Sequence, residues 1–96
     1  MNEVGFRKFL AETNTPKKVI RDHVSRLKRI EKSISNCDLD EEYEKNECSE
    51  LLKLCEKNYD LSQLSLEIIA PLPIGNYAMN TFKHSIKKYC QFRKSL

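Results

Sequence analysis

The sequence has little glycine and no long apolar run: only two of its 96 residues are glycine. Tight hairpin turns often depend on glycine, so we do not expect a β-sheet. The longest apolar stretch, from Leu66 to Ile74, contains Glu67 and is broken by prolines, so it is too short for a membrane span of about twenty residues. The amino-terminal segment carries charges at Glu3, Arg7 and Lys8, where a secretion signal needs an apolar core. We therefore expect a cytoplasmic protein that does not span a membrane.

The four cysteines, Cys37, Cys48, Cys55 and Cys90, have neither the paired spacing of a zinc site nor the density of a disulfide scaffold. We expect them to be reduced and to serve mostly as small core residues. A zinc site that uses Cys48, Cys55 and a histidine stays open, although these two cysteines would lie about two turns apart on a shared helix. The expectation is no metal and no other cofactor.

Catalytic motifs are also missing. No serine, cysteine or carboxylate belongs to a recognisable nucleophile motif, and no glycine-rich loop is present to cradle phosphates. The acidic residues do not have the spacing of a calcium-binding loop. We therefore expect that the chain is not an enzyme.

What is present is a globular balance of residues. Apolar residues make up 40% of the chain and charged residues 32%, which is typical of a folded protein. A chain of 96 residues has room for one hydrophobic core, so we predict a single helical domain over residues 1–96.

Two long segments have apolar residues at helical spacing. The first is expected to begin with Thr15 as cap and Pro16 as its first helical residue, and to end near Ser35. Its apolar side chains fill one arc of about 140°. They are Val19, Ile20, Val24, Leu27, Ile30 and Ile34. The second segment, residues 77–94, is expected to bury Ala78, Phe82, Ile86, Tyr89 and Phe92.

Three shorter helices are also predicted. One covers residues 2–12 and places Val4, Phe6, Phe9 and Leu10 on its apolar side. Another covers residues 38–46, and its early carboxylates suit the positive end of the helix dipole. A third begins with Ser49 as cap and stops at Asn58, and a loop follows from residue 59 to 76. The prediction is an all-α, compact bundle of four to five helices.

The net charge is only +3, so the distribution of charge is more informative than its sum. On the first long helix, the basic side chains lie opposite the apolar arc, with Asp22 among them. These are Lys17, Lys18, Arg21, Arg26, Lys28, Arg29 and Lys32. The last helix gathers a similar face of Asn80, Lys83, His84, Lys87, Lys88, Gln91 and Lys94. The acidic residues concentrate between Asp38 and Glu50, and none follows Glu67.

Two basic faces and one acidic segment favour binding to a polyanion. Cations hold phosphates, while asparagine and glutamine can reach base edges, so double-stranded DNA is the expected partner. His84 lies on a basic face and is a candidate phosphate contact, whereas His23 lies on the apolar arc and is expected to be a core imidazole. The alternative is that the charged faces only keep amphipathic helices in solution.

The segments FRKFLAETNTPKKVIRDHVSRLKRIEKSI and GNYAMNTFKHSIKKYCQFRKS, on either side of the acidic middle, resemble the amino-terminal core-binding domain of tyrosine recombinases and phage integrases. The likeness consists of a phenylalanine-rich first helix, a threonine-started second helix and a last helix with a basic pair between aromatic residues. It implies a SAM-like bundle that clamps one side of duplex DNA with its two long helices. By position, it implies DNA contacts at Lys17, Lys18, Arg21, Arg29, Asn80, Lys83, His84, Lys87 and Lys88.

The catalytic arginines, histidine and tyrosine of recombinases belong to a further domain, so this chain is not expected to recombine DNA alone. It could be part of a longer protein or a free-standing one. The other function that stays open is a small phage or mobile-element protein that binds a protein partner through its acidic segment or through residues 61–74. Self-association through Tyr59, Leu64 and Leu66 also stays open.

Overall fold

Five helices account for most of the residues described by the computed structural model, which are 1–56, 66–70 and 76–96, with the backbone alone at 76–78. They are α1 (Glu3–Glu12), α2 (Lys17–Ser33), α3 (Leu39–Asn46), α4 (Ser49–Leu54) and α5 (Asn76–Lys94). These ranges contain no strand, although an isolated bridge pairs Ile34 with Ile68. The predicted all-α bundle is therefore confirmed.

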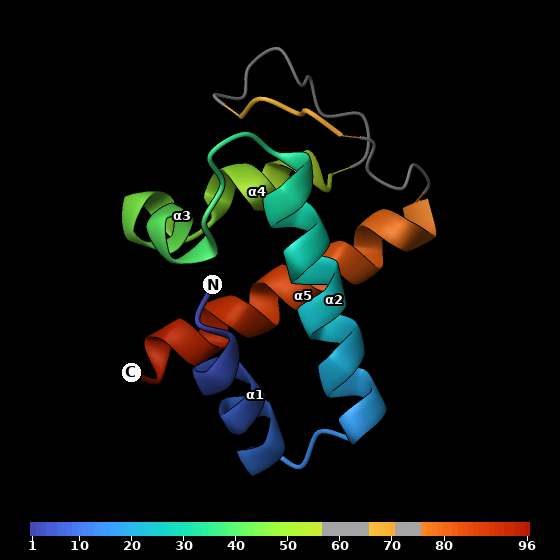
Figure 1. Cartoon of the computed structure of the whole chain (residues 1–96), viewed down its shortest axis with the longest axis vertical. Coiled ribbons are helices and arrows are strands. Elements are labelled where there is room, and N and C mark those ends of the chain that lie inside the picture. Colours follow the sequence, from blue (N-terminus) through green and yellow to red (C-terminus); the bar gives the residue numbers. More distant parts are fainter. Residues whose placement is uncertain (57–65, 71–75) are drawn as a thin grey trace.

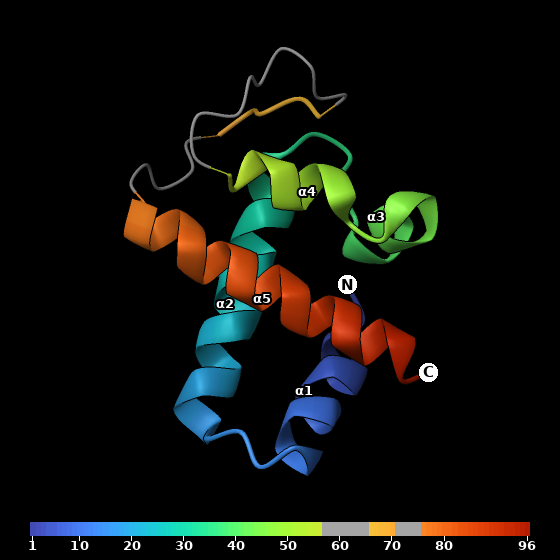
Figure 2. The same ribbon diagram turned by 180° about the vertical axis from the view of Figure 1, so that it is seen from behind.

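The two long helices, α2 and α5, cross and form two layers. In Figure 1, α2 lies in front of α5, and in the reverse view of Figure 2, α5 lies in front of α2. α1 packs against both long helices, and α4 packs against α3 and α5. The shortest dimension of the molecule is 19 Å, which is the thickness of two packed helices. The outward faces of α2 and α5 therefore belong to opposite sides of the bundle.

The predicted apolar face of α2 forms most of one side of the core. Leu27 is fully buried, Val24 and Ile30 are nearly so, and Ile34 continues the face as the residue that ends the helix. Val19 was predicted to belong to this face, but it is 39% exposed. The reason is visible in Figure 1, where the first turn of α2 extends beyond α5 and has no neighbour on that side.

An aromatic cluster joins α1 to the carboxyl-terminal half of α5. Phe6 and Tyr89 are fully buried, with ring centroids 5.1 Å apart, and Phe6 lies 5.9 Å from Phe92. Gly5 permits the close packing of α1 against Phe92, because a Cβ atom at that position would lie 2.9 Å from the ring of Phe92. The prediction for Val4 is wrong, since this residue is 82% exposed. Val4 precedes the buried Phe6 by two positions, so the two side chains point about 200° apart around the helix axis.

Two of the predicted caps are also wrong. Pro16 occupies the N-cap position of α2 without a side-chain cap bond, and the hydroxyl of Thr15 lies 3.2 Å from that of Thr13 instead. The N-cap of α4 is Cys48, and Ser49 is the first helical residue. The φ angle of Cys48 is 62°, so the chain reverses direction at this residue. α4 ends at Leu54, so it is shorter than predicted, and Asn58 lies outside the described residues.

The acidic helix α3 begins one residue later than predicted, at Leu39. Asp38 is its N-cap and accepts a hydrogen bond from the N–H of Asp40. The amino-terminal ammonium group of Met1 lies in the same region and is bonded to Asp38 at 2.6 Å and to Glu31 at 3.0 Å. Burial alone would lower the pKa of this ammonium group, but the hydrogen bonds to Asp38 and Glu31 outweigh burial and raise it to about 10.

Residues 66–70 form a short described segment that pairs with the end of α2. The N–H of Ser35 donates to the carbonyl of Glu67, and the N–H of Ile69 donates to that of Ser33, both at 2.8 Å. Ile68 and Ile69 remain 41% and 60% exposed. The rest of the predicted loop, including Tyr59, Leu61 and Leu64, lies outside the described residues, as does the side chain of Ala78.

Truncation of a buried residue and of an exposed residue should have different effects on stability. Leu27→Ala is expected to lower the free energy of unfolding by about 2 to 5 kcal/mol, because it leaves a cavity between α2 and its neighbours. Val4→Ala removes a side chain that is mostly in water and should change it by less than about 0.5 kcal/mol. Urea unfolding followed by circular dichroism measures both. Equal losses in the two variants would contradict the described helix faces.

The ammonium group of Met1 should make stability fall at high pH. Its pKa rises from 8.0 to about 10 in the folded chain, so the contribution is complete below pH 8 and is lost as the pH rises through 10. A Gly-Ser extension before Met1 should lower the urea midpoint at neutral pH and remove this part of the pH dependence. All other groups are the same in both proteins, so the difference between the two pH profiles is the relevant measurement. An extended chain as stable as the original at neutral pH would contradict the role given to this group.

Candidate nucleic-acid interface

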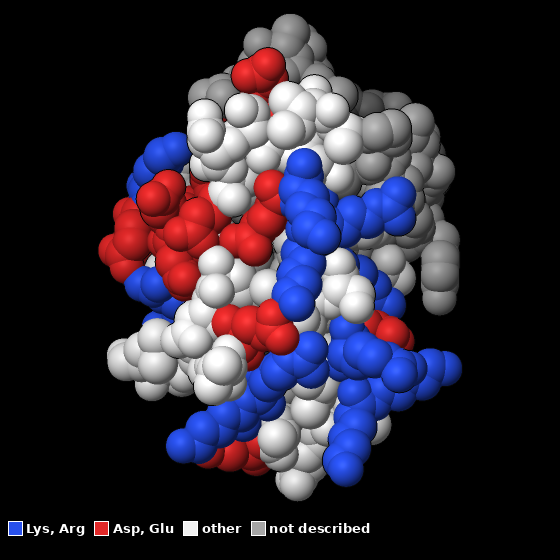
Figure 3. Space-filling model, in the orientation of Figure 1, with Lys and Arg blue, Asp and Glu red and all other residues white. Residues whose placement is uncertain are grey.

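The outward face of α2 carries a continuous set of cations. Lys17, Lys18, Arg21 and Arg29 are all exposed, and none forms an ion pair with another described residue. Figure 3 shows lysine and arginine side chains along the length of α2 on this side of the molecule. Lys28 differs, because it pairs with Glu3 at 2.7 Å. The predicted basic arc of α2 is thus a solvent-facing surface with few internal counter-ions.

An open hollow between α1 and α2 extends this surface. Its volume is about 550 Å³, and Ala11 and Ile20 are among its lining residues. The remaining lining residues are all cationic: Arg7, Lys17, Lys18 and Arg21. Arg7 comes from α1, a helix that the sequence did not implicate. Its Nε atom donates to Glu3 at 2.9 Å, which leaves the other guanidinium donors available.

The predicted residues of α5 lie mostly on the other side of the bundle. Asn80, His84 and Lys87 are exposed, while Lys83 and Lys88 are half-buried. α2 packs against the buried face of α5, which includes Ser85. The exposed face of α5 therefore points away from α2. The structure brings the α2 residues together and separates them from Asn80 and Lys87.

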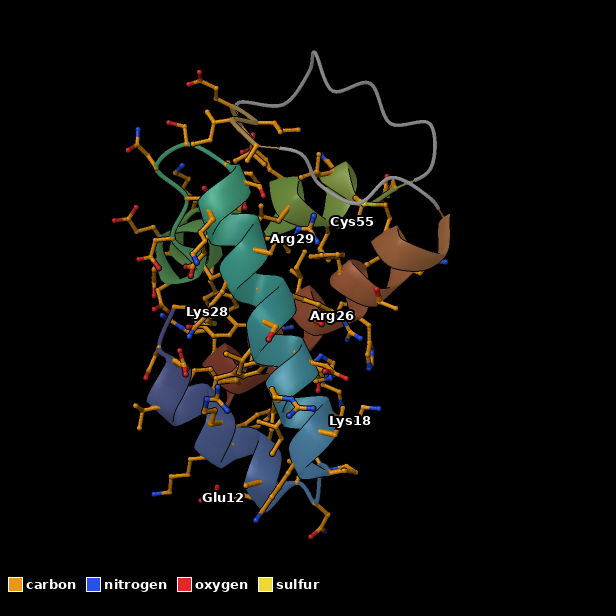
Figure 4. All side chains as sticks on the ribbon, turned by 45° about the vertical axis from the view of Figure 1, so that its right-hand side comes forward. Glu12, Lys18, Arg26, Lys28, Arg29 and Cys55 are labelled. Carbon is orange, nitrogen blue, oxygen red and sulfur yellow. The ribbon has the colours of Figure 1, made fainter. Side chains whose placement is uncertain are left out.

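The two basic faces meet at the crossing of α2 and α5. The ring of the exposed His84 lies 5.3 Å from that of the buried His23, and the guanidinium of Arg26 donates to Ser85 Oγ at 3.4 Å. Lys88 is close enough to act on the charge state of His23. We call Arg26, His84 and Lys88 the crossing cluster. Figure 4 shows Arg26 beside the crossing, whereas Lys28 lies at the edge of α2 towards α1.

Arg26 is one of the basic residues that the sequence-based list of DNA contacts left out. Periodicity places it on the basic arc of α2, but periodicity does not tell which edge of that arc faces α5. The relevant signal is a contact between residues far apart in the chain, since Arg26 and Ser85 are separated by 59 positions. No local pattern in the sequence contains that information.

His23 is a buried core imidazole, as predicted. It is 1% exposed, and its Nδ1 atom is hydrogen-bonded to Ser85 Oγ at 2.7 Å. Burial lowers the pKa of His23 to about 4, because the charged form loses its water, and the nearby His84, Arg26 and Lys88 act in the same direction. His23 therefore stays neutral at neutral pH and joins α2 to α5 through its hydrogen bond with Ser85.

The acidic surface, in contrast, contains its own cations. Arg93 donates to Asp40 at 2.8 Å and also pairs with Glu44, while Lys94 lies 3.9 Å from Glu47. Further pairs are made by Lys45 with Glu42 and by the ammonium group of Met1 with Asp38. Figure 3 shows acidic side chains gathered on the α3 side of the molecule. Much of the negative charge of α3 is thus compensated within the fold.

Comparisons with models of protein families, with curated proteins and with solved structures gave no match. Among the described residues, no group of three or more histidine, cysteine or acidic side chains could hold a metal ion. Within the same residues, no helix combines the length and the apolar character needed to cross a membrane.

Stability should depend on the neutral state of His23. Its pKa falls from 6.5 to about 4 on folding, so the unfolded chain binds more protons between these values. The contribution is complete above pH 6.5 and is lost as the pH falls towards 4. We expect the urea midpoint to fall between about pH 7 and pH 4.5, and His23→Gln to reduce this fall. His84→Gln, which alters the exposed neighbour, should retain it; identical pH profiles for wild type and His23→Gln would exclude this origin.

Proposed function

We propose that this chain binds the phosphate backbone of duplex DNA through the outward face of α2, the hollow between α1 and α2, and the crossing cluster. The observation that carries the proposal is the asymmetry of ion pairing. Asp40, Glu42 and Glu44 of α3 are matched by cations of the same fold. In contrast, Lys17, Lys18 and Arg21 have no ion-pair partner among the described residues. A surface of unpaired cations is stabilised by an external polyanion.

The dimensions of α2 suit this partner. Lys17 and Arg29 lie twelve positions apart, which corresponds to about 18 Å along a helix. A DNA duplex carries about ten negative charges over that length. The hollow adds Arg7 beside Arg21, and two guanidinium groups can hold phosphate oxygens more specifically than ammonium groups. Affinity would come mainly from phosphate contacts and would depend little on base sequence.

The resemblance to the core-binding domain of tyrosine recombinases supports the same partner and adds a stricter geometry. A clamp that uses both long helices requires one duplex to contact α2 and α5 together. Since the outward faces of these helices lie on opposite sides, the DNA would have to bend around the crossing cluster. Bending over such a short site costs free energy, so we favour a duplex that lies on the α2 side and reaches His84 and Lys88 at its edge.

The second candidate is a protein-interaction module. Exposed isoleucines at Ile68 and Ile69 favour it, because adjacent apolar side chains in water often mark a contact surface. The acidic segment offers weaker support, since Arg93 and Lys94 already pair with its carboxylates.

A salt titration tests the proposal. The chain should bind a labelled random duplex of about thirty base pairs, and the logarithm of affinity should fall with the logarithm of salt concentration with a slope of about −4 or steeper. Arg29→Glu should weaken binding by about tenfold or more and flatten the slope. Lys53→Glu, on α4, makes the same change in net charge at an exposed site outside the proposed surface and should have little effect. No binding at low salt, or equal losses in the two variants, would refute the proposed interface.

Two neighbouring lysines distinguish the two DNA geometries. Lys88 belongs to the crossing cluster, while Lys87 lies on the exposed face of α5. On the α2-sided geometry, Lys88→Glu weakens duplex binding and Lys87→Glu leaves it nearly unchanged. Equal losses in the same titration would instead support a duplex bent around both helices.

A further inference from the structure

Two of the four cysteines are neighbours in space although they lie on different elements. Cys48 is the N-cap of α4 and is fully buried, and Cys90 is half-buried on α5. The Sγ atom of Cys90 lies 3.5 Å from the carbonyl oxygen of Glu47, which belongs to the peptide bond that leads into Cys48. The Sγ atom of Cys48 donates to the carbonyl oxygen of Leu39 at 3.8 Å, and the side chains of Cys48 and Cys90 are close enough to act on each other's charge state.

These two thiols have opposite acidities. The neighbouring Cys48 side chain lowers the pKa of Cys90, and the charge of Lys94 adds to this effect, although burial and the charge of Glu47 oppose it. The neighbouring Cys90 side chain and burial raise the pKa of Cys48. Burial also raises the pKa of Cys37 to about 12 and that of Cys55 to about 11. Cys90 is half-buried whereas Cys48 is fully buried, so Cys90 is the thiol of this pair that a peroxide can reach, and its lowered pKa favours the reactive thiolate.

We propose that Cys90 and Cys48 form an oxidation-sensitive pair, which a hydroperoxide converts into a disulfide between α5 and the turn that joins α3 to α4. The thiolate of Cys90 attacks one peroxide oxygen, so the O–O bond breaks, sulfur is oxidised to a sulfenic acid, and the leaving oxygen takes a proton to become water or an alcohol. The sulfur of Cys48 then attacks Cys90, the S–O bond breaks, and the thiol proton leaves with the hydroxyl group as a second water.

The backbone around Cys48 is suited to this reaction. Glu47 and Cys48 have φ values of 55° and 62°, so Cys48 lies in a two-residue reversal between helices and not in a helix interior. The link would join parts that already contact each other through Arg93 and Asp40. The pair contains no residue of the proposed DNA surface, so this inference is independent of the proposed function.

Treatment of the folded chain with hydrogen peroxide tests the pair. The intact mass should decrease by two hydrogen atoms, and peptide mapping should show a link between Cys48 and Cys90 that a dithiol reductant reverses. The link closes a long loop, so the Tm of the oxidised chain should rise by about 5 °C or more. Cys37→Ser, which alters the other half-buried thiol, should still give the same link.

A second variant traps the intermediate. In Cys48→Ala the sulfenic acid on Cys90 has no resolving thiol, so it should accumulate and react with dimedone at that position. Cys90→Ser, at a half-buried site, should prevent both the link and the dimedone adduct. A link from Cys48 to Cys37, dimedone labelling mainly at Cys37 or Cys55, or unchanged thiols in the folded chain would each overturn the proposal.

Discussion

The buried hydroxyl group of Tyr89 holds the fold together. It donates a hydrogen bond to Asp40 at 2.6 Å and accepts one from the backbone N–H of Asn2 at 2.7 Å, while its ring is fully buried against Phe6. One side chain of α5 thus joins α1, through the aromatic cluster, to α3, through a carboxylate. Because a buried hydroxyl without partners would cost free energy, the packing of the ring and the position of Asp40 are coupled. Arg93 and the ammonium group of Met1 then collect around the same carboxylate.

This arrangement explains why the two charged surfaces behave differently. The carboxylates of α3 are used within the fold, because they bind the amino terminus and the last turns of α5. Apart from Arg26 and Lys28, the cations of α2 have no comparable partner among the described residues, since the core needs only the opposite side of that helix. A net charge of +3 therefore understates the field on the α2 side. The proposed binding of DNA depends on this local excess of positive charge.

The sequence predicted the elements well and their mutual positions poorly. Helical periodicity identified the buried faces of α2 and α5, and Leu27, Phe82 and Ile86 are buried as expected. Periodicity could not show that the outward faces of these helices lie on opposite sides, because that depends on contacts between residues such as His23 and Ser85, which are 62 positions apart. The buried face of the short helix α1 was predicted less well, since Val4 is exposed. The turn at Glu47 and Cys48 had no signal in the sequence, since neither residue is the glycine that positive φ usually selects.

The crossing of α2 and α5 links packing to the proposed function. At this crossing, His84, Arg26 and Lys88 surround the neutral, buried His23 and disfavour its protonation. Asp22 has a smaller effect in the opposite direction. Burial lowers the pKa of His23 most, and the three basic groups lower it further because they create a positive potential at the edge of the bundle. A phosphate placed at that edge would be attracted by the same potential, and it would not disturb the hydrogen bond between His23 and Ser85 inside. The hydrogen bond that joins the two helices therefore lies beside cations that neither helix could gather alone.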